Sequence, residues 1–100
     1  MKTRLTAPAR RQADGLDRWW RQHRPDVADL FARELDAARR LIADAPAMVG
    51  APYVERRGEL VRRILLPKTN NHVYYAIERD TDVVMIVAVW GAPKGRGPKL

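Results

Sequence analysis

The clearest pattern along the chain is a helical one over residues 26–44. Apolar side chains recur in steps of three and four through this stretch and one residue past it, at Val27, Phe31, Leu35, Ala38, Ile42 and Ala45. Such steps place side chains on one face of a helix. Residues 9–23 repeat the pattern, and Pro25 separates the two stretches because proline ends a helix and Asp26 can open the next. The short connection predicts two antiparallel helices, a helical hairpin.

The pattern changes after the segment 46–52, which contains two prolines and a glycine and is predicted to be a loop. Residues 60–66, 72–79 and 83–90 then read as strands joined by short turns, which makes them antiparallel neighbours. The last of them is apolar on both faces, as expected of a covered inner strand. Tyr53 and Val54 begin a further strand-like stretch that Gly58 interrupts, and residues 2–6 alternate like a short edge strand.

Helices followed by strands in a chain of 100 residues, without a repeat or a dividing linker, predict one α+β domain over residues 1–100. The helical hairpin should cover one face of a small antiparallel sheet. The other face is then open to a partner or substrate.

The charge changes this picture by suggesting an anionic partner. Nineteen Lys and Arg residues face 12 Asp and Glu residues, for a net charge of +7, and 15 of the cations are arginine. Arginine suits phosphate and carboxylate geometry, although arginine usage driven by a GC-rich genome is an alternative explanation.

Composition also sets limits on chemistry and location. The chain has no cysteine, which removes disulfides and thiol catalysis and fits a reducing cytoplasm. Its apolar runs reach only strand length and its start has no apolar core of a signal peptide, so neither a membrane span nor secretion is expected. His23 and His72 lie far apart without metal-ligand spacing, so we expect no metal and no cofactor.

Three segments resemble the RelE/ParE superfamily of toxins, and together they extend over essentially the whole chain. The family's first strand and helix resemble LTAPARRQADGLDRWW, and its Pro–Gly–Pro connection resembles PAMVGAPY. Its arginine-bearing strand, its strand with a tyrosine pair and its valine-rich last strand resemble GELVRRILLPKTNNHVYYAIERDTDVVMIVAVWGAPKGRGPKL. The resemblance implies the order β-α-α-β-β-β and the toxin of a bacterial type II toxin–antitoxin system.

The resemblance implies a partner and a choice of targets. The partner is a cognate antitoxin, expected to wrap the toxin with an acidic segment. ParE-like members poison DNA gyrase, and this is the activity we predict. The alternative is a RelE-like, ribosome-dependent mRNA endoribonuclease, which would make the protein a metal-independent enzyme. A non-toxic nucleic-acid-binding accessory domain is a second alternative, although the chain shows neither a helix-turn-helix signature nor the aromatic pattern of an RNA-recognition motif.

Four residues are candidates for catalysis if the protein cuts RNA. Such an enzyme needs a base for the 2′-hydroxyl, cations for the phosphate and an acid for the leaving oxygen. The family's arginine-bearing strand maps onto Arg62 and Arg63, which point to opposite faces, so the sequence leaves open which one is functional. His72 and Tyr74 share a face and could act as acid and base. We favour the structural interpretation, in which His72 caps a turn and Tyr74 packs at the surface.

The tail after Trp90 favours an activity based on binding. It contains no His or Tyr, which the nuclease members often carry there, but it offers three cations that can bind a phosphate and are poor proton donors at neutral pH. These predicted target-binding residues are Lys94, Arg96 and Lys99. Trp90 ends the last strand and is expected to anchor the tail.

Overall fold

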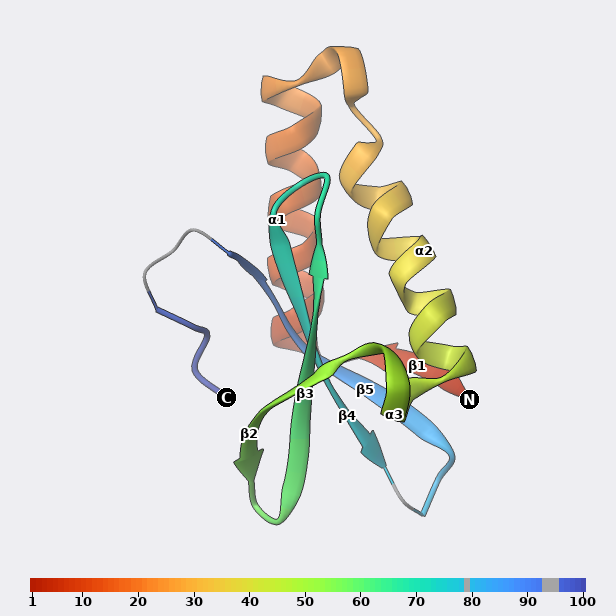
Figure 1. Cartoon of the computed structure of the whole chain (residues 1–100). Coiled ribbons are helices and arrows are strands. Elements are labelled where there is room, and N and C mark those ends of the chain that lie inside the picture. The colour runs from red at the N-terminus through yellow and green to blue at the C-terminus, as the bar shows by residue number, and fades with distance from the viewer. Residues whose placement is uncertain (79, 93–95) are drawn as a thin grey trace.

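The two long helices form a hairpin on one face of a five-stranded sheet in the computed structural model, which describes residues 1–78, 80–92 and 96–100 (Figure 1). The first strand β1 (Lys2–Leu5) leads into α1 (Ala7–His23), and a 3-10 turn (Pro25–Val27) connects α1 to α2 (Leu30–Asp44). A single helical turn, α3 (Pro46–Val49), precedes the strands β2 (Ala51–Arg56), β3 (Glu59–Leu66), β4 (Asn71–Glu78) and β5 (Val83–Gly91). The predicted α+β architecture is confirmed.

The sheet order is β1-β5-β4-β3-β2, in which β1 runs parallel to β5 and the other neighbours are antiparallel. The N-terminal strand is therefore an edge strand, and β5 is an inner strand, both as predicted. The helices and the sheet share one core, to which they contribute Ala9, Ala13, Phe31, Ala38, Ile42, Leu66, Val73, Tyr75, Val84, Ile86 and Val89.

The helix boundaries differ from the prediction for local reasons. The first helix begins at Ala7 because the hydroxyl of Thr6 accepts a hydrogen bond from the Ala9 amide at 3.2 Å, and Pro8 fits the first turn, where no amide partner is needed. The second helix begins at Leu30 and not near Asp26, since the residues after Pro25 form the 3-10 turn.

The strands also extend beyond the prediction. Tyr53 and Val54 belong to the complete strand β2, and Gly58 does not interrupt it. Arg57 and Gly58 instead form a two-residue hairpin turn with φ values of 52° and 79°, the left-handed conformations that match the twist of paired strands. Four strands, not three, therefore follow the helices. The loop expected over residues 46–52 contains α3, and residue 79, the predicted end of a strand, lies outside the described residues.

Two irregularities in strand pairing shape the face of the sheet that the helices leave open. The register shifts between Pro52 and Val54 in β2, and between Tyr74 and Tyr75 where β4 meets β5. A bulge of this kind adds a residue to one strand and re-aims its neighbours. Within the described part of the chain, no helix has the length and apolarity that crossing a membrane would require.

Candidate functional site

The pairing of β3 with β4 decides which candidate residues share the open face. Arg63 lies opposite Tyr74, and Arg62 lies opposite Tyr75. Directly opposed side chains share a face, and residues two apart on a strand do too, so His72 joins Tyr74. Tyr75 is fully buried in the core beneath the helices. Arg63, His72 and Tyr74 therefore lie together on the open face.

Arg62 points to the helix side of the sheet, where it has a structural contact. Its guanidinium Nη1 donates a hydrogen bond to the Gly50 carbonyl oxygen at 2.9 Å. This bond ties the middle of β3 to the residue before β2. Of the two arginines between which the sequence could not choose, the structure places Arg63 with the other candidates and Arg62 apart from them.

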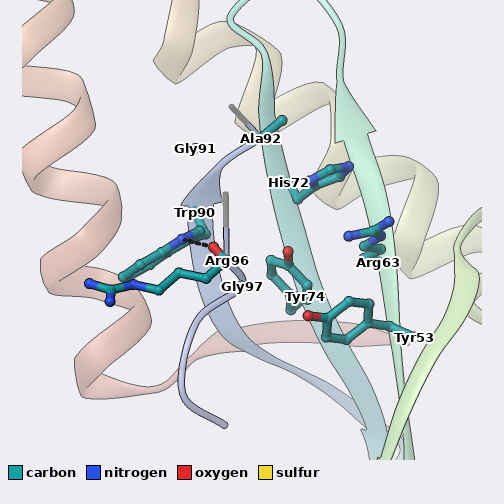
Figure 2. A pocket seen from close by; sticks show the side chains of 9 residues that line it. All are labelled: Tyr53, Arg63, His72, Tyr74, Trp90, Gly91, Ala92, Arg96 and Gly97. Atoms are coloured by element: carbon teal, nitrogen blue, oxygen red, sulfur yellow. Dashed lines mark hydrogen bonds between the residues drawn. The ribbon is translucent and has the colours of Figure 1, made fainter. Parts of the chain in front are cut away.

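The open-face candidates line a shallow pocket of about 310 Å³ (Figure 2). Strands β2 to β5 supply its floor, and the tail supplies one wall. Its lining residues are Tyr53, Arg63, His72, Tyr74, Trp90, Gly91, Ala92, Arg96 and Gly97. The pocket thus combines two guanidinium-bearing residues, a histidine and three large aromatic side chains.

Aromatic contacts fix the orientation of Arg63. Its guanidinium carbon lies 4.8 Å from the centroid of the Tyr53 ring, in a cation–π arrangement. Tyr53 in turn meets Tyr74 edge to face, with centroids 4.9 Å apart, and Tyr74 meets His72 at 6.0 Å. The four side chains form a continuous series across three strands, so Arg63 presents its charge from a defined position (Figure 2).

His72 is held toward its neutral form. Burial lowers the pKa of its imidazole below the usual value, and the positive charge of Arg63 lowers it further. A neutral imidazole can accept a proton at pH 7. The neutral imidazole is the form that can accept a proton, whereas Tyr74, only 2% exposed, is largely closed to a substrate in this conformation.

The predicted target-binding cations have different surroundings. Arg96 accepts, through its backbone oxygen, a hydrogen bond from the Trp90 indole Nε1 at 3.1 Å, and its side chain points away from Arg63 (Figure 2). This contact places Trp90 as the anchor that the sequence suggested. Lys99 is exposed. Lys94 lies outside the described residues.

Sequence reasoning missed the contributions of Tyr53 and Gly97 to the pocket. Tyr53 reaches Arg63 only because β2 is a complete strand with a bulge at this residue. Gly97 packs so closely on Tyr53 that a Cβ at this position would overlap the tyrosine hydroxyl. A glycine in a loop gives no sequence signal of such a contact, but an aromatic residue one strand away from an arginine could have suggested the cation–π pair.

The described residues contain no group of three or more His, Asp or Glu side chains placed to hold a metal ion. The side chains that line the pocket come from four strands and the tail. These can bind an anion through Arg63 and stack or cap a planar group on exposed aromatic surface.

Comparison with known proteins gives two findings at the level of family and fold. Residues 3–92 match the family model described as the ParE toxin of the type II toxin–antitoxin system parDE. The fold is similar to a chain in the crystal structure of the toxin–antitoxin complex RelBE2 from Mycobacterium tuberculosis, with a TM-score of 0.58 and 22% identity over 90% of this chain and 95% of that one. No curated protein matches. Because the family model spans most of the sequence and the strands that build the pocket, the chain belongs to the ParE toxin family of type II toxin–antitoxin systems.

Proposed function

We propose that this toxin arrests growth by acting on DNA gyrase. The observation that supports the proposal is the match of residues 3–92 to the ParE family, because the resemblance to ParE-like toxins implies gyrase as the target. A gyrase poison acts by binding, so it needs a complementary surface and not a complete set of proton-transfer groups. The open face fits this requirement, since it presents Arg63 in a fixed position beside exposed aromatic surface.

The tail is the second part of the proposed binding surface. Arg96 lines the pocket, and the exposed Lys99 adds positive charge three residues further along the tail. Both lie beyond residue 92, where the family match ends. We therefore assign the tail to contacts that distinguish this toxin within its family, and the sheet to contacts that members share.

A cognate antitoxin is the proposed partner of the same face. Lys2 and Arg4 stand on the open side of the sheet at its β1 edge, where Glu78 and Asp82 line the same pocket, and Arg63 adds a cation at the other pocket of that face. An acidic, extended segment would complement these charges and steer association. Such a segment would neutralise the toxin by covering the residues that its target needs.

Ribosome-dependent cleavage of mRNA is the second candidate function, and one observation favours it. The structure brings Arg63, His72 and Tyr74 into one pocket, with His72 held neutral. Arg63 could bind the phosphate and His72 could accept the 2′-hydroxyl proton. The buried position of Tyr74 counts against an acid role for it while the tail is in place.

Pulse-labelling after induction in a bacterial host would separate the two functions. Protein and DNA synthesis are followed over the first minutes, together with the integrity of transcripts. Early arrest of DNA synthesis with a DNA-damage response is the expected result. Early arrest of translation with transcripts cut at codon positions would replace the gyrase proposal by the nuclease one. A strain that expresses the toxin and continues both syntheses would contradict each of them.

A further inference from the structure

The segment of residues 96–100 folds back over the open face of the sheet, where it forms one wall of the pocket and covers an apolar cluster. Figure 2 shows Gly97 on the side of the sheet that carries Tyr53 and Tyr74. Leu100 packs against a small apolar cluster formed by Val61, Tyr74 and Ala88 on that face. The contact is side chain on sheet, and residues 96–100 form no strand.

The burial of this cluster is unusual for a sheet face that no helix covers. Val61, Tyr74 and Ala88 are exposed by only 2%, 2% and 1%. Their strands place them on the side opposite the helical hairpin, where side chains would otherwise meet water. The tail supplies part of the cover, and it thereby closes Tyr74 off from any molecule that approaches the pocket.

Among the residues that the structure describes, contacts of three different kinds hold the segment in place. The Trp90 indole N–H donates a hydrogen bond to the Arg96 backbone oxygen at 3.1 Å. Leu100 packs against the apolar cluster. Between them, the backbone of Gly97 lies against Tyr53, at a distance that leaves no room for a Cβ unless the hydroxyl moves. Tyr53 is also the residue that orients Arg63. The closed tail therefore touches the side chains that define the pocket.

These contacts are weak enough to open. Leu100 remains partly exposed, and the hydrogen bond from Trp90 is solvent-accessible. Segments held by few buried apolar contacts and exposed hydrogen bonds detach at low free-energy cost. The closed form can therefore dominate in the free protein and still give way to a binding partner.

We propose that residues 96–100 are a latch that covers Tyr74 and the apolar cluster beside the pocket of the free toxin, and that the growth target must displace it. The latch rests on the proposed function only in assuming that the open face carries the toxic contacts, whichever target they meet. Displacement exposes Tyr74 and the apolar cluster, and it releases Arg96 and Lys99 to contact the target. If about ten closed molecules exist for each open one, the latch weakens apparent target affinity about tenfold.

The latch itself can be measured without any target. Leu100→Asp should release the segment from the sheet, because a carboxylate loses solvation in an apolar site. Leu100→Met, which keeps an apolar side chain, is the matched control. Hydrogen exchange of the Trp90 indole N–H, assigned by the loss of its NMR signal in Trp90→Phe, reports the closed state. Leu100→Asp should exchange about tenfold faster than wild type and Leu100→Met at the wild-type rate. Equal rates in all three proteins would show that Leu100 closes nothing.

The gating role is measured by growth arrest, which does not depend on which target is correct. At matched protein levels, Leu100→Asp and Trp90→Phe should arrest growth at about tenfold lower expression than wild type, provided they fold. Circular dichroism and antitoxin co-purification check the fold. A released tail without any gain in toxicity would overturn the proposal. Failure of DNA synthesis to stop first in these cells would count against gyrase and leave the latch result intact.

Discussion

Arg62 and Arg63 are neighbours in sequence whose substitution should have different effects, because strand geometry turns them to opposite faces. We expect Arg63→Glu to abolish toxicity while the protein stays folded, since it reverses the charge at the pocket and loses a cation–π contact worth about 0.5–1 kcal/mol. Arg62→Gln is the matched variant. It should keep toxicity and lose about 1–2 kcal/mol of stability with the hydrogen bond to Gly50. Growth arrest and urea unfolding measure the two effects.

Two results would contradict this assignment of Arg63 to function and Arg62 to stability. A folded Arg63→Glu protein with full toxicity would remove the open face from the proposed mechanism. Loss of toxicity in a stable Arg62→Gln protein would show that the helix side contributes to function.

His72 should make the stability of the fold depend on pH below neutrality. Burial and the charge of Arg63 lower its pKa in the folded state, so the unfolded chain, with a pKa of about 6.5, binds the proton first as the pH falls. The contribution of neutral His72 is therefore complete above about pH 6.5 and is lost as the pH falls through its folded pKa. We expect His72→Gln to show a shallower decline in the free energy of unfolding between pH 7 and pH 5. Urea titrations at several pH values measure it, and parallel curves for the two proteins would contradict the assignment.

At the scale of elements, the turn between β3 and β4 depends on a side chain from α2. The carboxylate of Glu34 accepts hydrogen bonds from the amides of Lys68 and Thr69, at 2.6 and 3.0 Å, and from the Thr69 hydroxyl at 2.7 Å. Glu34→Ala should destabilise the fold by about 1–2 kcal/mol, because two turn amides lose their partner. Thermal unfolding would show it as a drop of about 4–8 °C per kcal/mol in Tm.

A surface ion pair on the same helix provides the control. Asp36 meets Arg40 at 2.7 Å with both side chains largely exposed, so Asp36→Ala should cost no more than about 0.5 kcal/mol. Equal losses for Glu34→Ala and Asp36→Ala would mean that the turn does not need its carboxylate.

Two glycines in different parts of the fold should respond to alanine in opposite directions. A Cβ at Gly50 would overlap the ring of Tyr75, which is fully buried and donates a hydrogen bond to Pro46 at 2.7 Å. Gly50→Ala should therefore destabilise by about 1–3 kcal/mol. Gly15 lies inside α1, with its nearest new contact at 3.9 Å, so Gly15→Ala should stabilise by about 0.5–1 kcal/mol. Urea unfolding of both variants tests the pair, and a loss of stability in Gly15→Ala would contradict the packing seen around α1.

The elements themselves could be predicted from sequence wherever one pattern dominated. Steps of three and four gave the helix face that buries Phe31 and Ile42, and the apolar run after Asp82 gave an inner strand. Strand β2 was only partly predicted because its six residues are all exposed and lack an apolar face. Periodicity records burial, so an exposed edge strand leaves little trace of it.

The residue types of the site could be predicted from the sequence, but the contacts among them could not. The alternation of side chains along a strand places Arg62 and Arg63 on opposite faces of the sheet. Both faces of this strand also carry apolar residues, so the sequence does not indicate which face the helices cover. The partners of Arg63 depend on a bulge at Tyr53 and on the return of the tail over Tyr74, and both arise from tertiary contacts. The role of Gly97 has the same origin, because its close contact involves a strand more than forty residues away in sequence.

At the scale of the whole molecule, the net charge of +7 is not spread evenly over the surface, because ion pairs reduce it on the helices. On the helices, Arg21, Arg33 and Arg40 each pair with an aspartate one turn earlier. These exposed pairs contribute little to stability, but they reduce the positive potential of the helical hairpin. The excess charge therefore acts mainly from the sheet and its tail, which is the side that we assign to the antitoxin and the target.

Removal of residues 94–100 should separate the two partners of that side. The deletion takes away the cations Lys94, Arg96 and Lys99, and it uncovers the apolar cluster at Tyr74. An antitoxin segment that binds along the sheet keeps Arg63, Lys2 and Arg4, whereas the growth target loses the tail cations that we assign to it. We expect toxicity to fall much more than antitoxin affinity, measured by growth arrest and by calorimetric titration of the purified pair. Equal loss of both would indicate a misfolded protein, and increased toxicity would show that the tail acts only as a cover.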